Sequence, residues 1–426
     1  MTIEQIHNKF LNCTGVCTDT RKIFKDCLFI ALSGDNFNGN TFAKQALEKG
    51  AKYALIDQKE YKINDQTILV NNSLESLQKL ANYHRKYLGL KIISLTGSNG
   101  KTTTKELINT VLSKKYKTVA TVGNLNNHIG VPLTLLSMNK DTEIGIVEMG
   151  ANHQKEIQFL CNIAEPDYGY ITNFGKAHLE GFGGIEGIIK GKSELYDYLI
   201  ENDKDIFMNA DDTIQQQKLK EYKKTVCFSS SKDKCDYQIE FKEVNPFVVF
   251  TFDNTRIESK LIGTYNFTNL CAATTIGKHF NVSTDDIKSA IESYIPSNNR
   301  SQIIDKGNNK IIMDAYNANP SSMEVALDNL NKLSDNRKIA ILGDMFELGN
   351  DAPSEHQKIA DLVINLNLDK IYLIGENFNR VTIKEDKIEK YSSFENFKSN
   401  FKEIRNSTIL IKGSRGMALE RVLELL

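Results

Sequence analysis

Short apolar runs alternate with longer amphipathic segments along most of the chain. The runs at 91–96, 143–149 and 168–173 have the length of buried strands, and helical periodicity fills the segments between them. Strands that alternate with helices imply a parallel sheet covered on both faces. The region that ends at Leu261 breaks this pattern. It predicts a smaller, more antiparallel insert, reached through a polar surface loop at 229–234.

The alternation divides the chain into three α/β units. We place them at residues 1–89, 90–296 and 297–426, with a turn-rich junction near Pro296. In the first unit we expect strands at 53–56 and 68–70 and helices at 41–49 and 74–88. In the third we expect strands at 310–314, 338–342, 370–374 and 408–411, and helices at 322–332, 355–366 and 417–425. This regular alternation favours a Rossmann-like sheet in the third unit.

Composition narrows the classes of function. The chain has 426 residues, of which 40% are hydrophobic and 25% charged, so wholesale disorder is excluded. The 53 Lys and Arg residues balance 54 Asp and Glu residues, which argues against a dedicated binder of nucleic acid or anionic membranes. No apolar run approaches the roughly 20 residues that span a bilayer, and the N-terminus lacks signal-peptide features. We therefore expect a cytoplasmic protein.

A glycine-rich segment follows the strand at 91–96 and opens a predicted helix at 104–112. Glycines allow backbone N–H groups to turn toward phosphate oxygens, and the helix N-terminus adds partial positive charge. In this pattern Lys101 reaches the β- and γ-phosphates and the Thr102 hydroxyl holds Mg²⁺. Leu95 stands where the general consensus has glycine, so the match is to a shorter loop form. The residues predicted to bind the nucleotide are Thr96, Gly97, Ser98, Asn99, Gly100, Lys101, Thr102 and Thr103.

An acidic residue, Glu148, ends the apolar strand at 143–149. A carboxylate at the C-terminal edge of a neighbouring parallel strand is where phosphate-bound magnesium finds a second protein ligand. The alternative is an ordinary strand-end acid that faces solvent. The phosphate loop upstream favours the metal ligand.

A lysine lies in the apolar stripe of a helix predicted to begin near Glu186. Ile188, Lys192, Leu195 and Leu199 fall on one face, whereas Lys190 points away. Burial lowers the pKa of a lysine and leaves a neutral amine that can take up CO₂ as a carbamate, an anionic ligand for a second magnesium. Most such lysines instead extend their amine to solvent.

These motifs together resemble the Mur ligase family, the ATP-dependent amide ligases of peptidoglycan synthesis, over nearly the whole chain. The resemblance implies three domains: a small uridine-nucleotide-binding domain, a central domain with a P-loop ATPase-like parallel sheet, and a Rossmann-like domain for the incoming amine. The chain departs from the family pattern in the loop Asn38-Gly39-Asn40, where Asp-Gly-His is usual, and at Asn299, where glycine is usual. The segments that carry the resemblance are 18–21, 28–34, 96–103, 123–132, 148–151, 177–180, 266–269, 314–320 and 343–349.

The resemblance assigns roles to residues whose type alone leaves them open. It implies that His178 coordinates a second magnesium with Glu148, and that Lys192 is the family's carbamoylated lysine. Arg300 would reach the γ-phosphate when the domains close, and a salt bridge at the rim is the alternative. The predicted catalytic residues are Lys101, Glu148, His178, Lys192 and Arg300, and the predicted metal ligands are Thr102, Glu148, His178 and Lys192.

Further residues are assigned to ligands in the same way. Asn266 and Asn269, at the start of a helix expected over 270–279, would recognise adenine, although N-capping is the alternative for Asn266. Asp314 would contact the ribose, with Asn317 beside it. Asn124 and Asn127 would contact the muramoyl substrate, and the segment 412–416 would open a helix that binds the dipeptide carboxylate. The uridine-domain resemblance adds Ser33 and Gly34 as substrate contacts.

The segments 314–320 and 343–349 most resemble family members that add a dipeptide. This implies UDP-N-acetylmuramoyl-tripeptide and D-alanyl-D-alanine as substrates, with ATP and two Mg²⁺ ions, in a monomer without nucleic-acid or membrane partners. The alternatives are a sister ligase that adds a diamino acid, or glutamate to folate, and a nucleotide-binding scaffold without chemistry. The four charged residues Lys101, Glu148, His178 and Lys192 argue against the scaffold.

Overall fold

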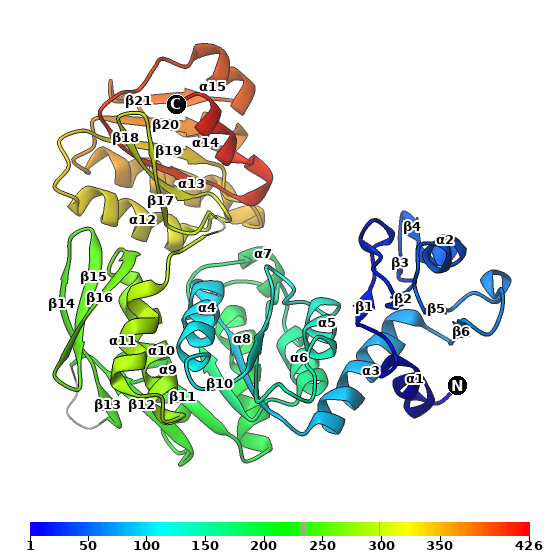
Figure 1. Cartoon of the computed structure of the whole chain (residues 1–426). Coiled ribbons are helices and arrows are strands. Elements are labelled where there is room, and N and C mark those ends of the chain that lie inside the picture. The colour runs from blue at the N-terminus through cyan, green and yellow to red at the C-terminus, as the bar shows by residue number, and fades with distance from the viewer. Residues whose placement is uncertain (232–234, 298) are drawn as a thin grey trace.

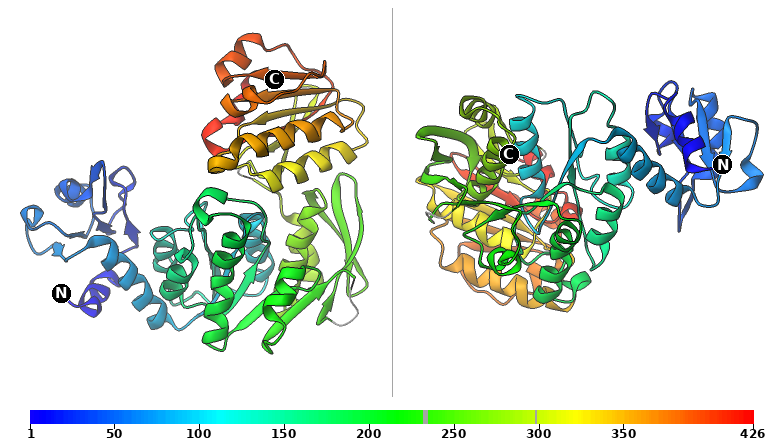
Figure 2. Two further views of the ribbon diagram at one scale, coloured as in Figure 1. Left: turned by 180° about the vertical axis from the view of Figure 1, so that it is seen from behind. Right: turned by 90° about the horizontal axis from the view of Figure 1, so that it is seen from below.

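The computed structural model describes residues 1–231, 235–297 and 299–426. The loop predicted at 229–234 therefore lies partly outside the described residues, as does Asn298 of the predicted junction. Three α/β domains follow one another along the chain, each built around its own sheet (Figure 1). The third domain lies over the second, and the first projects to one side (Figure 2). Within the described residues, no helix is both long enough and apolar enough to cross a bilayer.

The first domain is a small parallel sheet with the strand order β1-β2-β5-β6. Its last helix, α3, is capped by the Asn72 side chain, ends at Gly89 with φ 63°, and leads into the second domain. The strands are β1 (Val16–Cys17), β2 (Leu28–Ile30), β5 (Tyr53–Ile56) and β6 (Thr67–Leu69), with a separate hairpin of β3 (Ser33–Gly34) and β4 (Phe37–Asn38). The helices are α1 (Ile3–Phe10), α2 (Ala43–Glu48) and α3 (Ser73–Leu88), with short 3₁₀ turns η1 (Thr20–Lys22), η2 (Gly39–Phe42) and η3 (Lys59–Tyr61).

The second domain is a seven-stranded parallel sheet, as the alternating pattern predicts, with the order β13-β12-β11-β10-β7-β9-β8. Ile92 and Ile93 of β7 are both fully buried, but in core clusters on opposite faces, which explains the continuous apolar run. The strands are β7 (Lys91–Thr96), β8 (Thr118–Ala120), β9 (Ile144–Glu148), β10 (Tyr168–Ile171), β11 (Asp205–Asn209), β12 (Thr225–Ser229) and β13 (Tyr237–Gln238). The helices on its faces are α4 (Lys101–Leu112), α5 (Gly130–Leu136), α6 (Glu156–Ala164), α7 (Leu179–Phe182), α8 (Ile185–Glu201), α9 (Thr213–Leu219), α10 (Tyr265–His279) and α11 (Thr284–Ser293).

The antiparallel insert predicted before Leu261 is confirmed. It is a three-stranded sheet that packs on α10 and α11 and shares the apolar core on that side of the large sheet. Its strands are β14 (Glu240–Val244), β15 (Phe247–Phe252) and β16 (Thr255–Ile262).

The third domain is a six-stranded sheet with the order β17-β18-β22-β19-β20-β21, parallel except for β17. Helix α12 lies on the side of this domain that faces the second domain (Figure 1). The strands are β17 (Gln302–Lys306), β18 (Asn309–Asp314), β19 (Lys338–Gly343), β20 (Lys370–Ile374), β21 (Ile388–Tyr391) and β22 (Thr408–Lys412). The helices are α12 (Pro320–Lys332), α13 (Ala352–Ile364), α14 (Glu376–Arg380) and α15 (Phe394–Asn400), with a 3₁₀ turn η4 (Gly349–Asp351).

The helix predicted at 417–425 is wrong. The chain forms two 3₁₀ segments, η5 (Arg415–Met417) and η6 (Leu419–Glu424), separated by Ala418 at φ 47°. Leu419 and Val422 are fully buried and three residues apart, a spacing that a 3₁₀ helix presents on one face as well as an α-helix does. The segment 412–416 therefore opens no α-helix, so the helix-start argument for a carboxylate site there does not hold, and a role of this segment in binding the dipeptide stays a prediction.

Candidate active site

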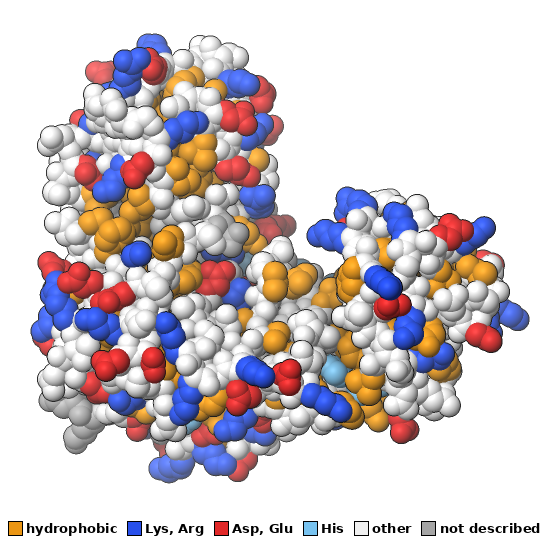
Figure 3. All heavy atoms as spheres, in the orientation of Figure 1, with side chains coloured by type: hydrophobic (Ala, Val, Ile, Leu, Met, Phe, Trp, Pro, Cys, Tyr) orange, Lys and Arg blue, Asp and Glu red, His pale blue; other side chains and the backbone are white. Residues whose placement is uncertain are grey.

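A cleft of about 1120 Å³ lies between the second and third domains. In space-filling view the molecule is hollowed above the second domain, between the other two, and positive and negative side chains intermix on the visible surface (Figure 3). Strand ends and loops of the second domain form the floor, and the loops after β18 and the start of α12 form the opposite wall. The predicted site residues that line the cleft are Ser98, Asn99, Gly100, Lys101, Thr102, Thr103, Asn124, Asn127, Glu148, His178, Asn266, Asn269, Arg300, Asp314 and Asn317.

The loop between β7 and α4 is held in shape by close backbone approaches. Gly97 has φ 141°, and a Cβ there would lie 2.0 Å from the Thr172 hydroxyl oxygen, so only glycine fits. The Ser98 N–H donates to the Asn173 carbonyl (3.1 Å) and the Asn99 N–H to the Asn173 side-chain oxygen (3.1 Å). The loop is thus a preformed turn at the start of a twelve-residue helix, the arrangement that binds phosphate.

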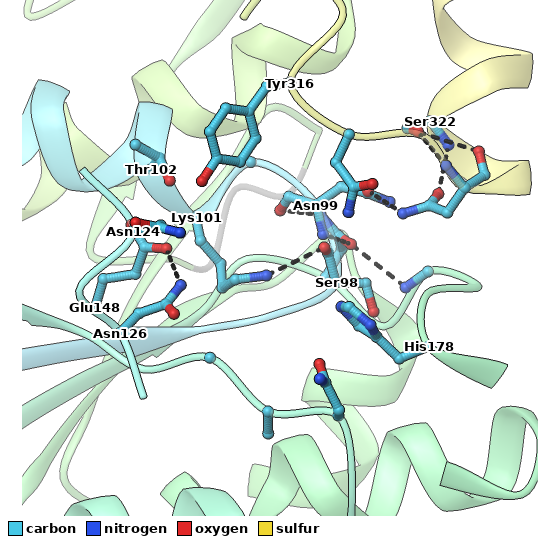
Figure 4. Close-up of a pocket in the computed structure, with 18 of the residues that line it drawn as sticks. Ser98, Asn99, Lys101, Thr102, Asn124, Asn126, Glu148, His178, Tyr316 and Ser322 are labelled. Carbon is cyan, nitrogen blue, oxygen red and sulfur yellow. Dashed lines mark hydrogen bonds between the residues drawn. The ribbon is translucent and has the colours of Figure 1, made fainter. Parts of the chain in front are cut away.

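Lys101 begins α4, and its side chain turns back along the loop (Figure 4). Its Nζ donates to the carbonyl oxygens of Gly97 (2.7 Å) and Ser98 (3.3 Å). Burial lowers its pKa, and the Arg300 charge lowers it further, whereas Glu148 opposes the shift. The ammonium therefore lies at the phosphate loop with carbonyl partners that a phosphate oxygen can replace.

Glu148 ends β9 beside the phosphate loop and is 1% exposed. Its Oε1 accepts a hydrogen bond from Asn126 Nδ2 (2.8 Å), while Oε2 is buried without a hydrogen-bond partner among the described residues. A buried carboxylate oxygen without a partner is costly unless a cation or donor binds it. The orphaned oxygen therefore fits the predicted magnesium ligand better than a solvent-facing acid.

The donors at the cleft suit magnesium with few protein ligands. The Thr102 hydroxyl is buried at the start of α4, and His178 lines the same cleft. Across the described part of the chain, no three His, Cys, Asp or Glu side chains gather into a metal cage. Magnesium bound to nucleotide keeps several waters and takes one or two protein ligands, so the residues present fit it.

Lys192 is completely buried in α8, with Ile188, Leu195 and Leu199 as predicted. Its Nζ donates to the Ala151 carbonyl (3.1 Å) and lies 4.9 Å from the centre of the Phe182 ring. Burial lowers its pKa well below the usual value, and the Lys101 charge lowers it further. Because Ala151 lines the cleft, Lys192 lies directly beneath the cleft floor.

The two asparagines of α10 face one point, but neither caps the helix, because α10 begins at Tyr265 rather than near 270. Asn269 Nδ2 donates to Asn266 Oδ1 (2.9 Å), and Asn269 Oδ1 accepts from the Thr104 hydroxyl (3.0 Å). Asn266 Nδ2 donates to the Ile262 carbonyl (2.8 Å). This pair fixes the side of the cleft next to α4.

The third-domain wall carries an ion pair that its sequence pattern did not reveal. Asp314 at the end of β18 accepts from Lys412 Nζ (2.6 Å) and from the Ser301 N–H (3.0 Å). The Arg300 guanidinium lies over the Tyr316 ring at 3.7 Å, and its Nε is buried without a hydrogen-bond partner among the described residues. Asp314 and Arg300 thus reach the cleft in fixed positions.

Asn299 explains one departure from the family pattern. It has φ 56°, in the left-handed region that glycine adopts most easily and asparagine tolerates better than most residues. The substitution of asparagine for glycine therefore keeps the turn before Arg300. In the other departure, Asn40 is buried. Its Nδ2 donates to Asp57 Oδ1 (2.8 Å) and its Oδ1 accepts from the Asp57 N–H (2.9 Å), which anchors the first-domain loop.

Some predicted substrate residues lie apart from the reaction cleft. Ser33 and Gly34 are exposed in the first-domain hairpin β3–β4, and the first domain lies to one side of the second, apart from the third domain (Figure 1). Asn124 is exposed on the cleft side of the second domain. Asn127 also lines the cleft, and its Oδ1 accepts from the N–H groups of Ile129 (3.1 Å) and Gly130 (2.9 Å), which shapes the turn into α5.

Contacts between the second and third domains include residues without a predicted role. Asn319 Nδ2 donates to Asn99 Oδ1 in the phosphate loop (2.8 Å), and the Ser321 hydroxyl accepts from the Lys176 N–H (2.9 Å). Asn126, Tyr316 and Asn319 all fall within segments that carry the family resemblance. Their position in these segments could have marked the three residues as candidates. It could not have shown which residue each of them contacts.

Three family models match consecutive parts of the chain. They are the Mur ligase family catalytic domain at residues 12–85, the Mur ligase middle domain at 95–277, and the Mur ligase glutamate ligase domain at 299–415. The chain therefore belongs to the Mur ligase family, which the motif resemblance predicted.

Two full-length relatives share one name. The chain is 34% identical to the UDP-N-acetylmuramoyl-tripeptide–D-alanyl-D-alanine ligase of Bacillus subtilis (strain 168), over 96% of this chain and 92% of the relative. It is 32% identical to the enzyme of that name from Escherichia coli (strain K12), over 97% and 93%. Among solved structures, MurF from Acinetobacter baumannii matches with a TM-score of 0.84 at 27% identity, over 100% of this chain and 98% of that one. MurF ligase from Thermotoga maritima in complex with ADP also has a TM-score of 0.84, at 26% identity, over 98% and 97%.

Proposed function

We propose that this chain is an ATP-dependent ligase that joins D-alanyl-D-alanine to UDP-N-acetylmuramoyl-tripeptide, through an acyl phosphate, in peptidoglycan precursor synthesis. The observation that carries the proposal is one cleft with a phosphate loop and a metal-suited carboxylate on one side and a third domain in contact with that loop on the other. Full-length relatives with this activity in their name support the choice of substrates.

The three domains divide the substrates. We assign residues 1–89 to the UDP-linked substrate, with Ser33 and Gly34 as contacts, 90–296 to ATP, and 297–426 to the incoming dipeptide. A monomer in the cytoplasm, where both ATP and UDP-linked precursors occur, is part of the proposal.

The first step is attack of the tripeptide carboxylate on the γ-phosphorus of ATP, with ADP as the leaving group. Lys101 and Arg300 stabilise the negative charge that spreads over the transferring phosphoryl oxygens. Asn124 and Asn127 hold the muramoyl substrate at the floor of the cleft. Asn266, Asn269, Asp314 and Asn317 hold the nucleoside across the domain boundary.

The second step is attack of the neutral dipeptide amine on the acyl carbon. The amine loses a proton, the C–O bond to phosphate breaks, and an amide remains. Water would hydrolyse the acyl phosphate, so the closed contacts between Asn319 and Asn99 and between Ser321 and Lys176 serve to exclude it.

Magnesium, when bound, neutralises the triphosphate and the acyl carboxylate so that they can approach each other. Thr102, Glu148 and His178 would hold two ions. We include a carbamate on Lys192 because its amine is desolvated directly beneath the cleft floor. Intact-mass measurement of native protein kept in bicarbonate tests this: we expect a gain of one CO₂ that Lys192→Arg abolishes.

Phosphate release from ATP in the presence of UDP-N-acetylmuramoyl-tripeptide tests the proposed function. We expect release with D-alanyl-D-alanine, and a matching mass gain of the nucleotide substrate. Release instead with diaminopimelate, lysine or glutamate would keep the chemistry and overturn the dipeptide assignment. ATP binding without release for any amine would support the scaffold.

A further inference from the structure

A third-domain acid contacts the predicted metal ligand His178. The loop between β19 and α13 carries Glu347, and its Oε2 lies against His178 Nδ1 across the domain boundary. His178 is mostly buried, whereas Glu347 is about half exposed. The contact lowers the pKa of Glu347, as expected for a carboxylate that faces an imidazole. The two side chains therefore interact directly only while the domains are together.

Both residues have unusual backbone conformations. His178 has φ 55° and Glu347 has φ 62°, in the left-handed region that residues with side chains rarely adopt. Such conformations persist where the surrounding structure imposes them, and they cluster at functional sites. The side chains of these two residues meet across the domain boundary.

The Glu347 loop is fixed from behind by the third domain. Asp344 accepts from the N–H groups of Asn377 and Phe378 at the start of α14 (both 2.9 Å). The next two N–H groups are also paired, that of Met345 with His356 Nε2 (2.9 Å) and that of Phe346 with the Ser414 hydroxyl (2.8 Å). Glu347 is therefore presented from a rigid support rather than from a free loop.

The same loop fits closely against the segment that carries His178. A Cβ at Gly349 would lie 3.0 Å from the Cβ of Glu180, so a larger residue could not enter without movement. Lys176 reaches Glu355 on the third-domain side (3.7 Å). The contact of Glu347 with His178 is thus part of a shaped interface and not a lone surface pair.

We propose that Glu347 is a positioning residue that orients the His178 imidazole for magnesium and so completes the second metal site only when the third domain closes. Metal-bound histidines usually present their other ring nitrogen to a carboxylate or carbonyl, which fixes the ring and raises its basicity. Glu347 occupies Nδ1, which leaves Nε2 for the metal. The inference rests on the proposed function, since it assumes the magnesium role of His178.

Metal binding, read without turnover, tests this inference. The probe is Mn²⁺, titrated by electron paramagnetic resonance into the full-length protein with a non-hydrolysable ATP analogue and UDP-N-acetylmuramoyl-tripeptide. We expect Glu347→Gln to weaken one class of bound Mn²⁺ by about 10–100-fold and to leave the other class unchanged. Glu347→Asp, which keeps the charge, should restore part of the affinity. Glu385→Gln, at an exposed glutamate of the same domain, is the matched control and should change nothing.

A double-mutant cycle separates positioning from a structural effect. His178→Asn should weaken the same class of bound Mn²⁺ while leaving a measurable affinity, and Glu347→Gln should cause no further loss in that background. Equal Mn²⁺ affinities in wild type and Glu347→Gln, or additive losses in the double variant, would overturn the inference. Because this measurement needs no amine, a failure of the ligation assay leaves it readable. If the wild-type protein ligates normally and Glu347→Gln leaves Mn²⁺ binding unchanged, the proposed role of Glu347 is wrong and the proposed function stands.

Discussion

Two lysines at two glycine-containing loops have opposite surroundings. Lys101 lies after β7, and among the described residues it donates only to backbone carbonyls of its own loop. Lys412 ends β22 and is almost completely buried, with Asp314 Oδ2 at 2.6 Å and the Asn317 carbonyl at 3.2 Å. One lysine has partners that a ligand can replace, and the other already has a carboxylate partner.

The loops after β7 and β22 also lead into different structures. Residues 97–100 lead into the twelve-residue helix α4, whose first residues line the cleft. Residues 413–416 lead into 3₁₀ turns that pack Leu419 into the third-domain core. Both strands are followed by glycines, but only the loop at 97–100 opens a long helix and, within the described part of the chain, has a lysine without a carboxylate partner. We therefore expect phosphate to bind at that loop and not at 413–416. Lys101 is the catalytic candidate, and Lys412 supports Asp314.

We expect the largest effect, a loss of kcat, for Lys101→Ala. Loss of one charge stabiliser should lower kcat by about 10²–10³-fold, with little change in thermal stability. The ligation assay measures kcat, and a thermal melt measures the stability. Lys114→Ala, at the exposed end of the same region, is the control. Near-normal kcat in Lys101→Ala would contradict its role at the γ-phosphate.

For Lys412→Met we expect a loss of stability instead. Removal of one partner from a buried ion pair leaves Asp314 uncompensated and should cost about 3 kcal/mol of unfolding free energy. Urea denaturation followed by circular dichroism measures it. The double variant Lys412→Met/Asp314→Asn should lose less than the single variant. An equal or larger loss in the double variant would mean that the pair does not account for the effect.

Exchange of glycine for alanine should separate the two loops. Gly97→Ala would bring a Cβ to 2.0 Å from the Thr172 hydroxyl oxygen, so we expect about 1–3 kcal/mol weaker binding of an ATP analogue by calorimetry. A Cβ at Gly416 would contact only the partly exposed Phe346 ring, which can rotate away. We therefore expect Gly416→Ala to weaken binding of the ATP analogue by about 0.5 kcal/mol or less. Similar effects at both positions would contradict the proposed difference between the loops.

The smallest expected effect is on domain closure. Asn319→Asp keeps the N-cap of α12 but replaces the amide that donates to Asn99, so closure should weaken by about 0.5–1.5 kcal/mol. Small-angle scattering with an ATP analogue should show a larger open fraction. Asn72→Asp makes the same change at the N-cap of α3 and should not alter closure. Equal open fractions in the two variants would argue against the contact.

Local patterns predicted the strands and helices that a buried run or one apolar face defines. The segment 91–112 is an example, because its strand is buried on both faces and its helix has an apolar stripe. Patterns failed at 417–425, where apolar residues three apart suit both an α-helix and 3₁₀ turns. They also missed β17, β21, α14 and α15, which are short elements with mixed polarity.

The part of the site that a single sheet forms was predictable from the sequence. Glu148 and Lys101 end up together because parallel strands present their carboxyl ends at one edge of a sheet. Asn319 and Asn99 are 220 positions apart, and only the placement of one domain on another brings them together. The contact of Glu347 with His178 depends on the same placement. Neither pair leaves a periodic signal in the sequence.

The fate of one carboxylate oxygen shows whether an acyl phosphate forms. We would label the reacting carboxylate of UDP-N-acetylmuramoyl-tripeptide with a heavy oxygen isotope and supply ATP and D-alanyl-D-alanine. An acyl phosphate transfers one labelled oxygen to phosphate when the amine displaces it, so the account predicts one label in each released phosphate and a labelled amide product. Unlabelled phosphate, or release that does not depend on the dipeptide, would contradict it.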